Sequence, residues 1–340
     1  MSQAQPEKSA AIRSARTILL VLLSTSILFP TLYQPLLDNV WQLLRSWSVY
    51  RWSTWETLLT VFSYSAIEVP MTVAFMQHPE WRIAHEGKAQ QDEPLKKPKG
   101  MRRPSRRGYE ALVYVLPLLT LDLTLIKKFA DVSLEAMLRS GNYDPFVAGH
   151  KSTFLVPSLH NFTLASPLQT QRALPISAPS IRRLVLELVA SMVIYDALFF
   201  VFHLSMHMLP VLRTWHRAHH SHAEIHPQIT NQLHTVERLG LVLLANFSLN
   251  IIGSHVLTRT FFVPLFIWLL VEIHSGLDLP WAYDRILPAG WGGGARKHAL
   301  HHADGGGGLE PYFNWCDKLW DNIQKRRDVA TVVKPGVKIG

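Results

Sequence analysis

The sequence FHLSMHMLPVLRTWHRAHHSH, residues 202–222, contains six histidines. His203 and His207 are four residues apart, and the HRAHH segment that begins at His216 has the spacing i, i+3, i+4. On an α-helix these spacings place side chains on one face, where they can bind a common ligand. This stretch therefore predicts a helical metal site, and we expect the rest of the chain to be organised around it.

A further histidine segment, HALHH at residues 298–302, repeats the spacing of HRAHH, and thirteen of the 17 histidines lie between His203 and His302. Neutral imidazole is a good ligand for iron, zinc, copper and nickel. A lone histidine on an apolar face is normally a core residue, and a pH switch needs only one or two histidines. Disordered histidine tracts bind metal loosely, but these histidines lie among apolar and aromatic residues. A structured metal site explains the pattern best.

The number of histidines indicates more than one metal. A closed zinc site uses four ligands, and ten candidate histidines exceed that number. Soluble di-iron bundles use carboxylates with a Glu-x-x-His motif, and no Glu-x-x-His occurs in this sequence. We therefore expect a nearly all-imidazole centre for two metals, and its high charge favours an oxidising centre.

The composition favours a membrane-embedded unit. The chain has 340 residues, 48% of them hydrophobic, with 11 Trp and a formal net charge of +9. Its single cysteine, Cys316, excludes an internal disulfide and hence a disulfide-built secreted fold. The basic residues lie beside apolar runs and form no stripe with exposed aromatic residues, so nucleic-acid binding is excluded as a function.

Five apolar segments predict the topology. They are Thr17–Leu37, Glu56–Met76, Tyr109–Ile126, Leu184–Phe202 and a helical hairpin at residues 239–275 that enters the membrane and returns. The segment from His78 to Gly108 is rich in Lys and Arg, and the positive-inside rule places it in the cytosol. Alternation then places residues 127–183, with a glycosylation sequon at Asn161, in the lumen. Every histidine cluster falls on the cytosolic side.

These observations predict the fold class. We expect an all-α integral membrane protein, with a transmembrane helical bundle and a cytosolic helical histidine-rich cap that binds metal. The bundle would be formed by the apolar segments, and the cap by the histidine segments that follow Phe202 and the hairpin.

The histidine motifs occur in the order HLSMH, HRAHH and HALHH, and His234 and His274 lie in the segments HTVE and EIHSGLDLPW. In this order they resemble the fatty acid hydroxylase and sterol desaturase superfamily of membrane di-iron enzymes, and within it the cholesterol 25-hydroxylase-like enzymes. LRTWHRAHH, the GWGGG run before HALHH and PYFNWCDK after it carry the same resemblance. The resemblance covers residues 190–322.

The resemblance implies that ten histidines bind two Fe ions. They are His203, His207, His216, His219, His220, His234, His274, His298, His301 and His302. It also implies three regions in the chain. Residues 1–183 would be an N-terminal membrane-spanning region with loops, residues 184–322 a fatty acid hydroxylase-type di-iron catalytic domain, and residues 323–340 a polar tail.

The resemblance further implies an oxidoreductase of lipid biosynthesis. It would be an O2-dependent monooxygenase that hydroxylates an unactivated C–H bond of a sterol or another hydrophobic, lipid-like substrate. Electrons would come from cytochrome b5 or a reductase, because no Gly-x-Gly-x-x-Gly nucleotide fingerprint follows a strand-like run. The basic residues between Lys96 and Arg107 could steer such a donor. The implied location is the endoplasmic reticulum membrane, multi-pass, with the catalytic histidines facing the cytosol.

Two other functions remain open. A desaturase or methyl oxidase of the same superfamily would begin with the same hydrogen abstraction, so the ligands do not separate it from a hydroxylase. A membrane metal transporter or metal-binding protein would place ligands at mid-membrane in discontinuous helices. For an enzyme, we expect the substrate to enter from the bilayer between residues 184–202 and 239–275.

Several other residues near the motifs have two interpretations. His222 and His226 are extra histidines beyond the family pattern, and His255 is expected to have a core or turn role. The Gly305–Gly308 run is expected either to shape a substrate mouth or to form a flexible loop. Four acidic residues would either orient the histidines or act as caps and ion-pair partners: Asp196, Glu237, Asp278 and Asp317.

Overall fold

The computed structural model describes residues 6–83, 101, 108–127, 129–141, 158–159, 168–221, 225–305 and 307–332. Most of the basic segment between His78 and Gly108, the sequon at Asn161 and His222 lie outside the described residues.

The described chain is mostly helical. The α-helices are α1 (Pro6–Leu28), α2 (Gln34–Ser46), α3 (Trp55–Gln77), α4 (Gly108–Thr124), α5 (Leu134–Ser140), α6 (Ile181–Met208), α7 (Pro210–His216), α8 (Thr235–Ile251), α9 (Val256–His274), α10 (Tyr283–Ile286), α11 (Gly294–Asp304) and α12 (Trp315–Val332). Short 3-10 helices cover η1 (Pro30–Leu32), η2 (Val49–Arg51), η3 (Pro79–Trp81), η5 (His219–Ser221) and η6 (Pro227–Asn231). Strands β1 (Leu125–Ile126) and β2 (Ser158–Leu159) form one antiparallel pair.

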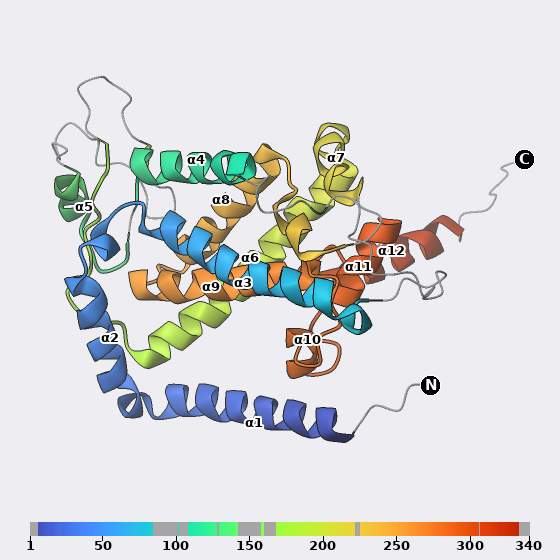
Figure 1. The fold of residues 1–340 in the computed structure, drawn as a ribbon, viewed down its shortest axis with the longest axis horizontal. Helices are drawn as coiled ribbons and strands as arrows, with labels where there is room; N and C mark the ends of the chain where they lie inside the picture. The colour runs from blue at the N-terminus through green and yellow to red at the C-terminus, as the bar shows by residue number, and fades with distance from the viewer. Residues whose placement is uncertain are drawn as a thin grey trace, which may run out of the picture.

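The long helices alternate in direction along the bundle (Figure 1). As a result, the C-terminal ends of α3, α6 and α9 lie at the same end as α11. A backbone hydrogen bond of 2.9 Å from Ile83 N to Gly276 O joins the chain after α3 to the chain after α9 at this end. The residue that precedes most of the basic segment, Ile83, therefore lies at the end of the bundle that carries α11.

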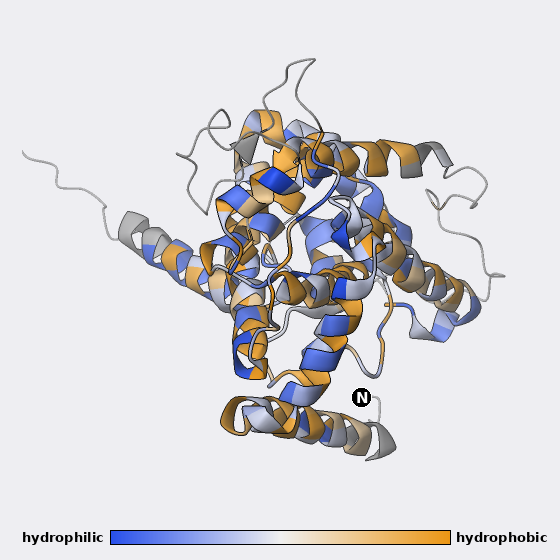
Figure 2. Cartoon of the chain, turned by 90° about the vertical axis from the view of Figure 1, so that its left-hand side faces the viewer, coloured by the Kyte–Doolittle hydropathy of each residue, from blue (hydrophilic) through white to orange (hydrophobic). Residues whose placement is uncertain are grey.

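Four helices are long and apolar enough to cross a membrane: Ala10–Leu28, Trp55–Gln77, Ile181–Met208 and Val256–His274. Many large hydrophobic side chains of α1, α3 and α6 are exposed, as expected for surfaces that meet lipid, and hydrophobic residues recur along the helices in Figure 2. The chain is thus a multi-pass membrane protein, and the helical membrane part of the predicted fold is confirmed.

Two of the predicted spans have different boundaries in the structure. The predicted span Thr17–Leu37 is broken, because α1 ends at Leu28 and Pro30 begins a 3-10 turn before α2. Proline lacks the N–H that a continuing helix requires. The predicted span Leu184–Phe202 is too short, since α6 continues to Met208. The first histidine pair therefore belongs to α6 itself.

The predicted hairpin at residues 239–275 consists of α8 and α9. The turn occupies residues 252–255, and Arg259 lies inside α9, buried at 3% exposure. Glu187 of α6 fixes this turn, because its Oε2 accepts hydrogen bonds from His255 N at 2.9 Å and Thr258 Oγ1 at 2.5 Å. The carboxylate of Glu187 thus satisfies backbone and hydroxyl donors that would be costly to leave unpaired.

The helices pack through aromatic and aliphatic side chains. Tyr195 and Phe199 of α6 meet Leu241 of α8 and Phe262 of α9 in one buried cluster. Met71 of α3 joins α9 in another buried cluster. This packing holds the C-terminal ends of α3, α6 and α9 together, and those ends carry the histidines.

The turn after α9 generates a stability prediction. Gly276 has φ +67°, and a Cβ at this position would overlap the carbonyl oxygen of Ile225. Gly290 has φ +79° with only the Lys318 side chain nearby, at 3.6 Å. We expect Gly290→Ala to cost about 1–2 kcal/mol from the left-handed backbone alone. Gly276→Ala should cost clearly more, because it adds a backbone clash. Thermal unfolding in detergent measures both, and equal losses would contradict the packing described.

Candidate metal centre

Nine histidines from five elements converge at one end of the bundle. They are His203 and His207 of α6, His216 of α7, His219 and His220 of η5, His274 at the end of α9, and His298, His301 and His302 of α11. The i, i+4 pair of α6 and the i, i+3, i+4 set of α11 share a helix face, as the spacing predicts. The HRAHH segment differs, because α7 ends at His216 and a 3-10 turn carries the next two histidines.

The first group contains five histidines: His203, His207, His216, His220 and His301. The Nε2 atom of His203 lies 3.0 Å from that of His216, 3.3 Å from that of His207 and 3.2 Å from that of His301. The Nε2 atoms of His216 and His220 are 2.9 Å apart. All five residues thus direct the same ring atom toward one point.

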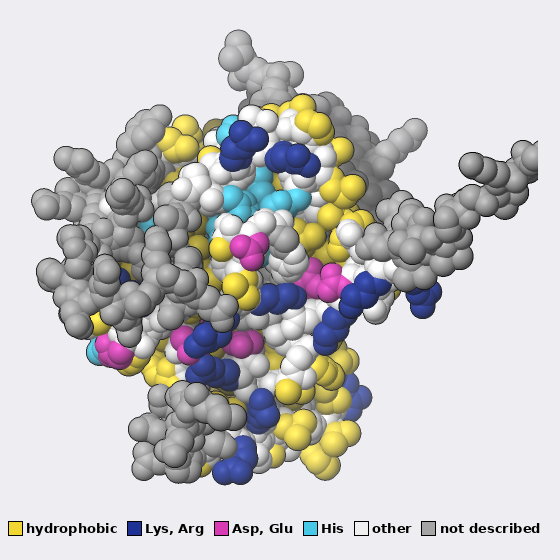
Figure 3. Space-filling view, turned by 90° about the vertical axis from the view of Figure 1, so that its right-hand side faces the viewer, with side chains coloured by type: hydrophobic (Ala, Val, Ile, Leu, Met, Phe, Trp, Pro, Cys, Tyr) yellow, Lys and Arg dark blue, Asp and Glu magenta, His cyan; other side chains and the backbone are white. Residues whose placement is uncertain are grey.

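The second group contains four buried histidines: His219, His274, His298 and His302. The Nε2 atom of His274 lies 3.3 Å from that of His219 and 3.0 Å from that of His298. The His298 and His302 Nε2 atoms are 3.2 Å apart. The His220 and His302 rings stack with centroids 4.5 Å apart, so the two groups are neighbours. The histidines are visible in the face at this end, with Lys and Arg side chains near them (Figure 3).

The outer nitrogens of several rings are held by hydrogen bonds. The Nδ1 atom of His203 contacts Leu309 O at 2.8 Å, and that of His274 contacts Leu270 O at 2.7 Å. The His216 Nδ1 atom contacts Glu237 Oε1 at 2.8 Å. A carbonyl or carboxylate at Nδ1 fixes the proton there and leaves the Nε2 lone pair free. Lone pairs that face one another at about 3 Å repel, and a bound cation would remove that repulsion, so the donor set fits metal ions.

The protonation of the histidines outside the membrane-spanning helices also fits metal binding. Burial, followed by the neighbouring imidazoles, lowers the pKa values of His219, His298 and His302 well below the usual histidine value. The pKa of His220 is lowered to about 3, first by burial and then by His216. These rings are neutral at pH 7, which is the state that ligates a metal.

His234 is the one predicted ligand that the structure does not bring to the other nine. It is the exposed N-cap of α8, where its Nδ1 accepts a hydrogen bond from Val236 N. Its ring stacks on Trp215 with centroids 5.0 Å apart. The start of α8 instead directs Glu237, three residues later, toward His216. The HTVE segment thus contributes its glutamate to the centre, and its histidine acts as a cap.

The remaining histidines considered from the sequence lie outside both groups. His255 is buried and caps the start of α9, which confirms the predicted turn role. His226 is buried just before η6 and belongs to neither group.

The chain between α11 and α12 is held by two of the acidic residues. Asp196 Oδ1 accepts from Tyr312 N at 2.8 Å, and Asp317 Oδ1 accepts from Leu309 N at 3.0 Å. Leu309 is the residue whose carbonyl holds His203. Of the four acids considered, Glu237 contacts a histidine directly and Asp317 holds Leu309, the partner of His203. Asp196 instead holds the chain at Tyr312, and Asp278 forms ion pairs with Arg285 and Arg296 at 2.5 Å.

The glycine run after α11 has a definite role. Gly305 adopts φ +64° and ends α11, while the carbonyl of Gly307 accepts from His301 Nδ1 at 3.0 Å. The backbone carbonyls of Gly307, Leu270 and Leu309 each contact a histidine Nδ1 atom, and the sequence did not predict them. No side-chain pattern marks them, because any residue type offers a carbonyl.

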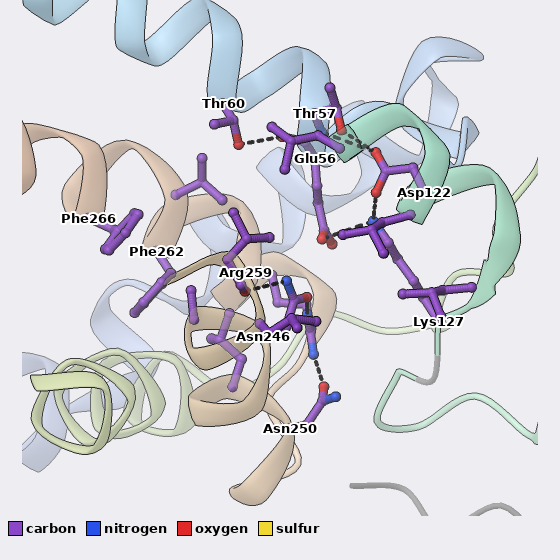
Figure 4. A pocket seen from close by; sticks show the side chains of 18 residues that line it. Glu56, Thr57, Thr60, Asp122, Lys127, Asn246, Asn250, Arg259, Phe262 and Phe266 are labelled. Atoms are coloured by element: carbon purple, nitrogen blue, oxygen red, sulfur yellow. Dashed lines mark hydrogen bonds and ion pairs between the residues drawn. The ribbon is translucent and has the colours of Figure 1, made fainter. Parts of the chain in front are cut away.

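Two neighbouring cavities have volumes of about 310 Å³ and 120 Å³, and Figure 4 shows the smaller one. The larger one reaches Leu270, whose carbonyl contacts His274 of the centre. Their walls come mainly from α3, α4, α8 and α9, and no residue of α6 lines either of them. The predicted substrate entry between α6 and the hairpin therefore does not match these cavities. The reason is that α6 packs directly on α8 and α9 through Tyr195 and Phe199.

Comparison with known proteins agrees with the histidine motifs. Residues 188–323 match the family model described as fatty acid hydroxylase. The chain is 37% identical over 147 residues to a cholesterol 25-hydroxylase-like protein of Danio rerio and 34% identical over 163 residues to cholesterol 25-hydroxylase of Homo sapiens. These matches cover 43% and 48% of this chain and 59% and 60% of the relatives. The resemblance to this superfamily is therefore confirmed.

A third relative extends the comparison to a different reaction. A Dictyostelium discoideum protein named "Putative methylsterol monooxygenase" is 31% identical over 153 residues, which are 43% of this chain and 54% of that protein. The matched region thus spans little more than half the length of these relatives. No solved structure matches the chain.

Glu237 generates a prediction about metal affinity. Glu237→Ala removes the acceptor at His216 Nδ1, and loss of such a partner weakens metal binding roughly 10- to 100-fold. Glu237→Gln keeps an acceptor oxygen and should lose less. The apparent Kd for Zn²⁺, used as a probe and measured against a competing chelator, tests this order.

The matched control for Glu237→Ala is Asp278→Ala. This substitution removes a carboxylate that pairs with Arg285 and Arg296 and with no histidine. It should leave Zn²⁺ affinity unchanged. Equal Kd values for Glu237→Ala and the unmodified protein would show that Glu237 does not hold the centre.

Proposed function

We propose that this protein is a membrane-bound non-haem di-iron oxygenase that uses O2 to hydroxylate an unactivated C–H bond of a sterol or another lipid-like substrate. The observation that carries the proposal is the convergence of nine histidine Nε2 atoms in two adjacent groups. Two groups support two metal positions, each with at least four imidazoles. His234 is not among the proposed ligands.

The identity of the metal follows from the proposed reaction. Zinc has no redox chemistry, whereas the relatives are named as hydroxylases and a monooxygenase, which are redox activities. Imidazole is a suitable ligand for iron. When bound, the irons would supply the activation of O2 and the oxidation of the C–H bond.

The residues of the chain would hold and orient the centre. Glu237 accepts a hydrogen bond from the Nδ1–H of His216, which fixes the orientation of the ring and leaves its Nε2 free to bind a metal. The carbonyls of Leu270 and Leu309 do the same for His274 and His203. The burial of the second group excludes water from its four histidines. The adjoining apolar cavities would hold the hydrophobic substrate.

Electrons would come from outside the chain, from cytochrome b5 or a reductase. We propose the endoplasmic reticulum membrane as the location, with the histidine centre facing the cytosol. The arrangement of the helices supports this orientation. Ile83, which precedes most of the basic segment, donates to Gly276 O at the histidine end of the bundle, and Met101 within that segment packs with Phe75 and Leu277. Basic segments remain in the cytosol.

Methyl oxidation is the second candidate, because one relative is named as a methylsterol monooxygenase. Desaturation differs from both in that the product loses two hydrogens and gains no oxygen. Metal transport has less support, since the nine histidines gather at one end of the bundle and form no path along it.

The proposal predicts the behaviour of two variants expressed in cells whose lipids are analysed by mass spectrometry. A variant with His219→Ala and His220→Ala removes one ligand from each group, so bound iron and the oxygenated product should both be lost. His234→Asn is the matched control, because asparagine also caps a helix, and it should retain iron and product.

Two outcomes would refute the proposed function. One is an active preparation that contains only zinc. The other is a double histidine variant that binds no iron and yet forms as much product as the unmodified protein. A product that differs from the substrate by one added oxygen identifies hydroxylation, and exact mass separates it from desaturation.

A further inference from the structure

The first turn of α11 has no cap of its own. Glycine occupies residues 292–294, and the N-cap residue, Gly293, has no side chain that could accept a hydrogen bond. The first N–H groups of an α-helix have no partner within the helix. Gly294 is buried at the start of α11, so its N–H needs an acceptor from another part of the chain.

Tyr283 supplies that acceptor. It begins α10, which lies beside α11 (Figure 1), and its phenolic oxygen accepts a hydrogen bond from Gly294 N at 3.0 Å. Its hydroxyl donates to the carbonyl oxygens of Tyr312 at 3.0 Å and Pro311 at 3.3 Å. Its backbone N donates to Glu272 Oε1 at 2.8 Å. Tyr283 thus connects α9, the start of α11 and the chain that precedes α12.

The glycines before α11 permit this close approach. A Cβ on Gly294 would lie 2.5 Å from the carboxyl carbon of Asp284, and a Cβ on Gly292 would lie 2.7 Å from Asp284 Cα. A side chain at either position would therefore push α10 away from α11. The run of glycines lets Tyr283 reach the first turn of the helix.

The two partners of Tyr283 belong to the helices that carry the second histidine group. Glu272 lies two residues before His274 on α9, and Gly294 begins the helix that carries His298 and His302. The Nε2 atoms of His274 and His298 are 3.0 Å apart. The two hydrogen bonds of Tyr283, to Glu272 and from Gly294, therefore form a strut that fixes α11 against α9.

The α9 end of this strut is itself fixed. Glu272 is 1% exposed, and its second carboxylate oxygen, Oε2, accepts a hydrogen bond from Trp268 Nε1 at 2.6 Å. Rotation of this carboxylate would leave buried donors without a partner, which is costly. The position of Tyr283 N is thus determined by α9.

Other contacts of α11 act differently. Arg296 lies 2.5 Å from Asp278, in the chain after α9, but its side chain is 63% exposed and solvent screens the pair. Lys297 lies 2.6 Å from Asp317, so it holds α11 to α12 and not to α9. The link through Tyr283 differs from both, because its partners on α9 and α11 are buried.

We propose that Tyr283 is a positioning residue that caps α11 and thereby holds the second histidine group together. The first group has four histidines outside α11, whereas the second has two, His219 and His274. Movement of α11 therefore affects the second group more. The inference rests on the metal centre of the proposed function and deepens it, because it makes one of the two metal positions depend on a hydroxyl that is not a ligand.

The test measures Zn²⁺ binding to the purified full chain in detergent, against a competing chelator that resolves two binding steps. Tyr283→Phe removes the hydroxyl and keeps the ring. It should weaken the step of the second group about 2- to 30-fold, the range for the loss of a helix cap. The step of the first group should change less, because most of its ligands do not depend on α11.

Two ligand variants assign the binding steps. His302→Ala removes a ligand from the second group, and His207→Ala removes one from the first group. The step that Tyr283→Phe weakens should be the step that His302→Ala impairs most. Equal weakening of both steps would overturn the proposal, and so would two unchanged Kd values.

Tyr33→Phe is the matched control, because it also removes a hydroxyl that forms a hydrogen bond, to Thr25 Oγ1 at 2.8 Å. It lies in the N-terminal part of the chain and should leave both Kd values unchanged. Asp278→Ala tests the exposed ion pair with Arg296. If Asp278→Ala weakens the second step and Tyr283→Phe does not, the proposal is wrong.

A second measurement uses the unmodified protein. Amides in the first turn of a helix normally lack a partner and exchange their hydrogen freely. Because Gly294 N donates to Tyr283, its amide should be protected, as measured by NMR on protein isotopically labelled at glycine. Free exchange at Gly294 would contradict the proposal, and this result needs no variant to fold.

The strut and the proposed function fail separately. Zn²⁺ binding and hydrogen exchange test the strut, whereas iron content and product formation test the enzyme. An active iron enzyme in which Tyr283→Phe leaves both Zn²⁺ steps unchanged would refute only the inference. A weakened second step in a protein that forms no oxygenated product would refute only the proposed function.

Discussion

The rest of the structure depends on holding many imidazole lone pairs against one another. Nine Nε2 atoms converge, with neighbours 2.9 to 3.3 Å apart, and without a cation they repel. The protein restrains the rings from behind, with Glu237 and the carbonyls of Leu270, Gly307 and Leu309 at their Nδ1 atoms. Because these partners come from α8, from α9 and from the chain after α11, the segments that carry them must pack closely against the histidine rings.

The same physical rule organises the opposite end of the bundle. Polar groups within an apolar helix bundle require partners, and Glu187 satisfies donors in the turn between α8 and α9. Arg259 obeys the rule only in part, because its Nε donor is unused. Arg259 and its polar neighbours line the smaller cavity, whereas Leu270, whose carbonyl contacts His274, lines the larger one.

The sequence predicted the centre more completely than it predicted the fold around it. Histidine is rare, and the spacing of His298, His301 and His302 has one simple helical explanation, so nine of the ten histidines were found together. His234 was assigned by resemblance alone, and the geometry uses it as a cap. The carbonyl partners could not be predicted, since they depend on how distant segments pack.

The span boundaries show the same division. The apolar runs correctly predicted helices, but not where they end. The first helix ends before Pro30, and α6 extends past the predicted end to include two histidines. Arg259 lies in an apolar run, where a charge normally marks a boundary between spans, yet the structure places it inside α9. Asn246 and Asn250 of the preceding helix accept its hydrogen bonds, which lowers the free-energy cost of burying the guanidinium. Such compensation is visible only once tertiary contacts are known.

The position of α11 decides which of the two histidine groups can be completed first. This helix supplies His301 to the first group and His298 and His302 to the second. Before α11 docks, the first group has four histidines and the second has only two, both from segments made earlier by the ribosome. The second group therefore has four histidines only when α11 is docked, whereas the first group has four histidines without it.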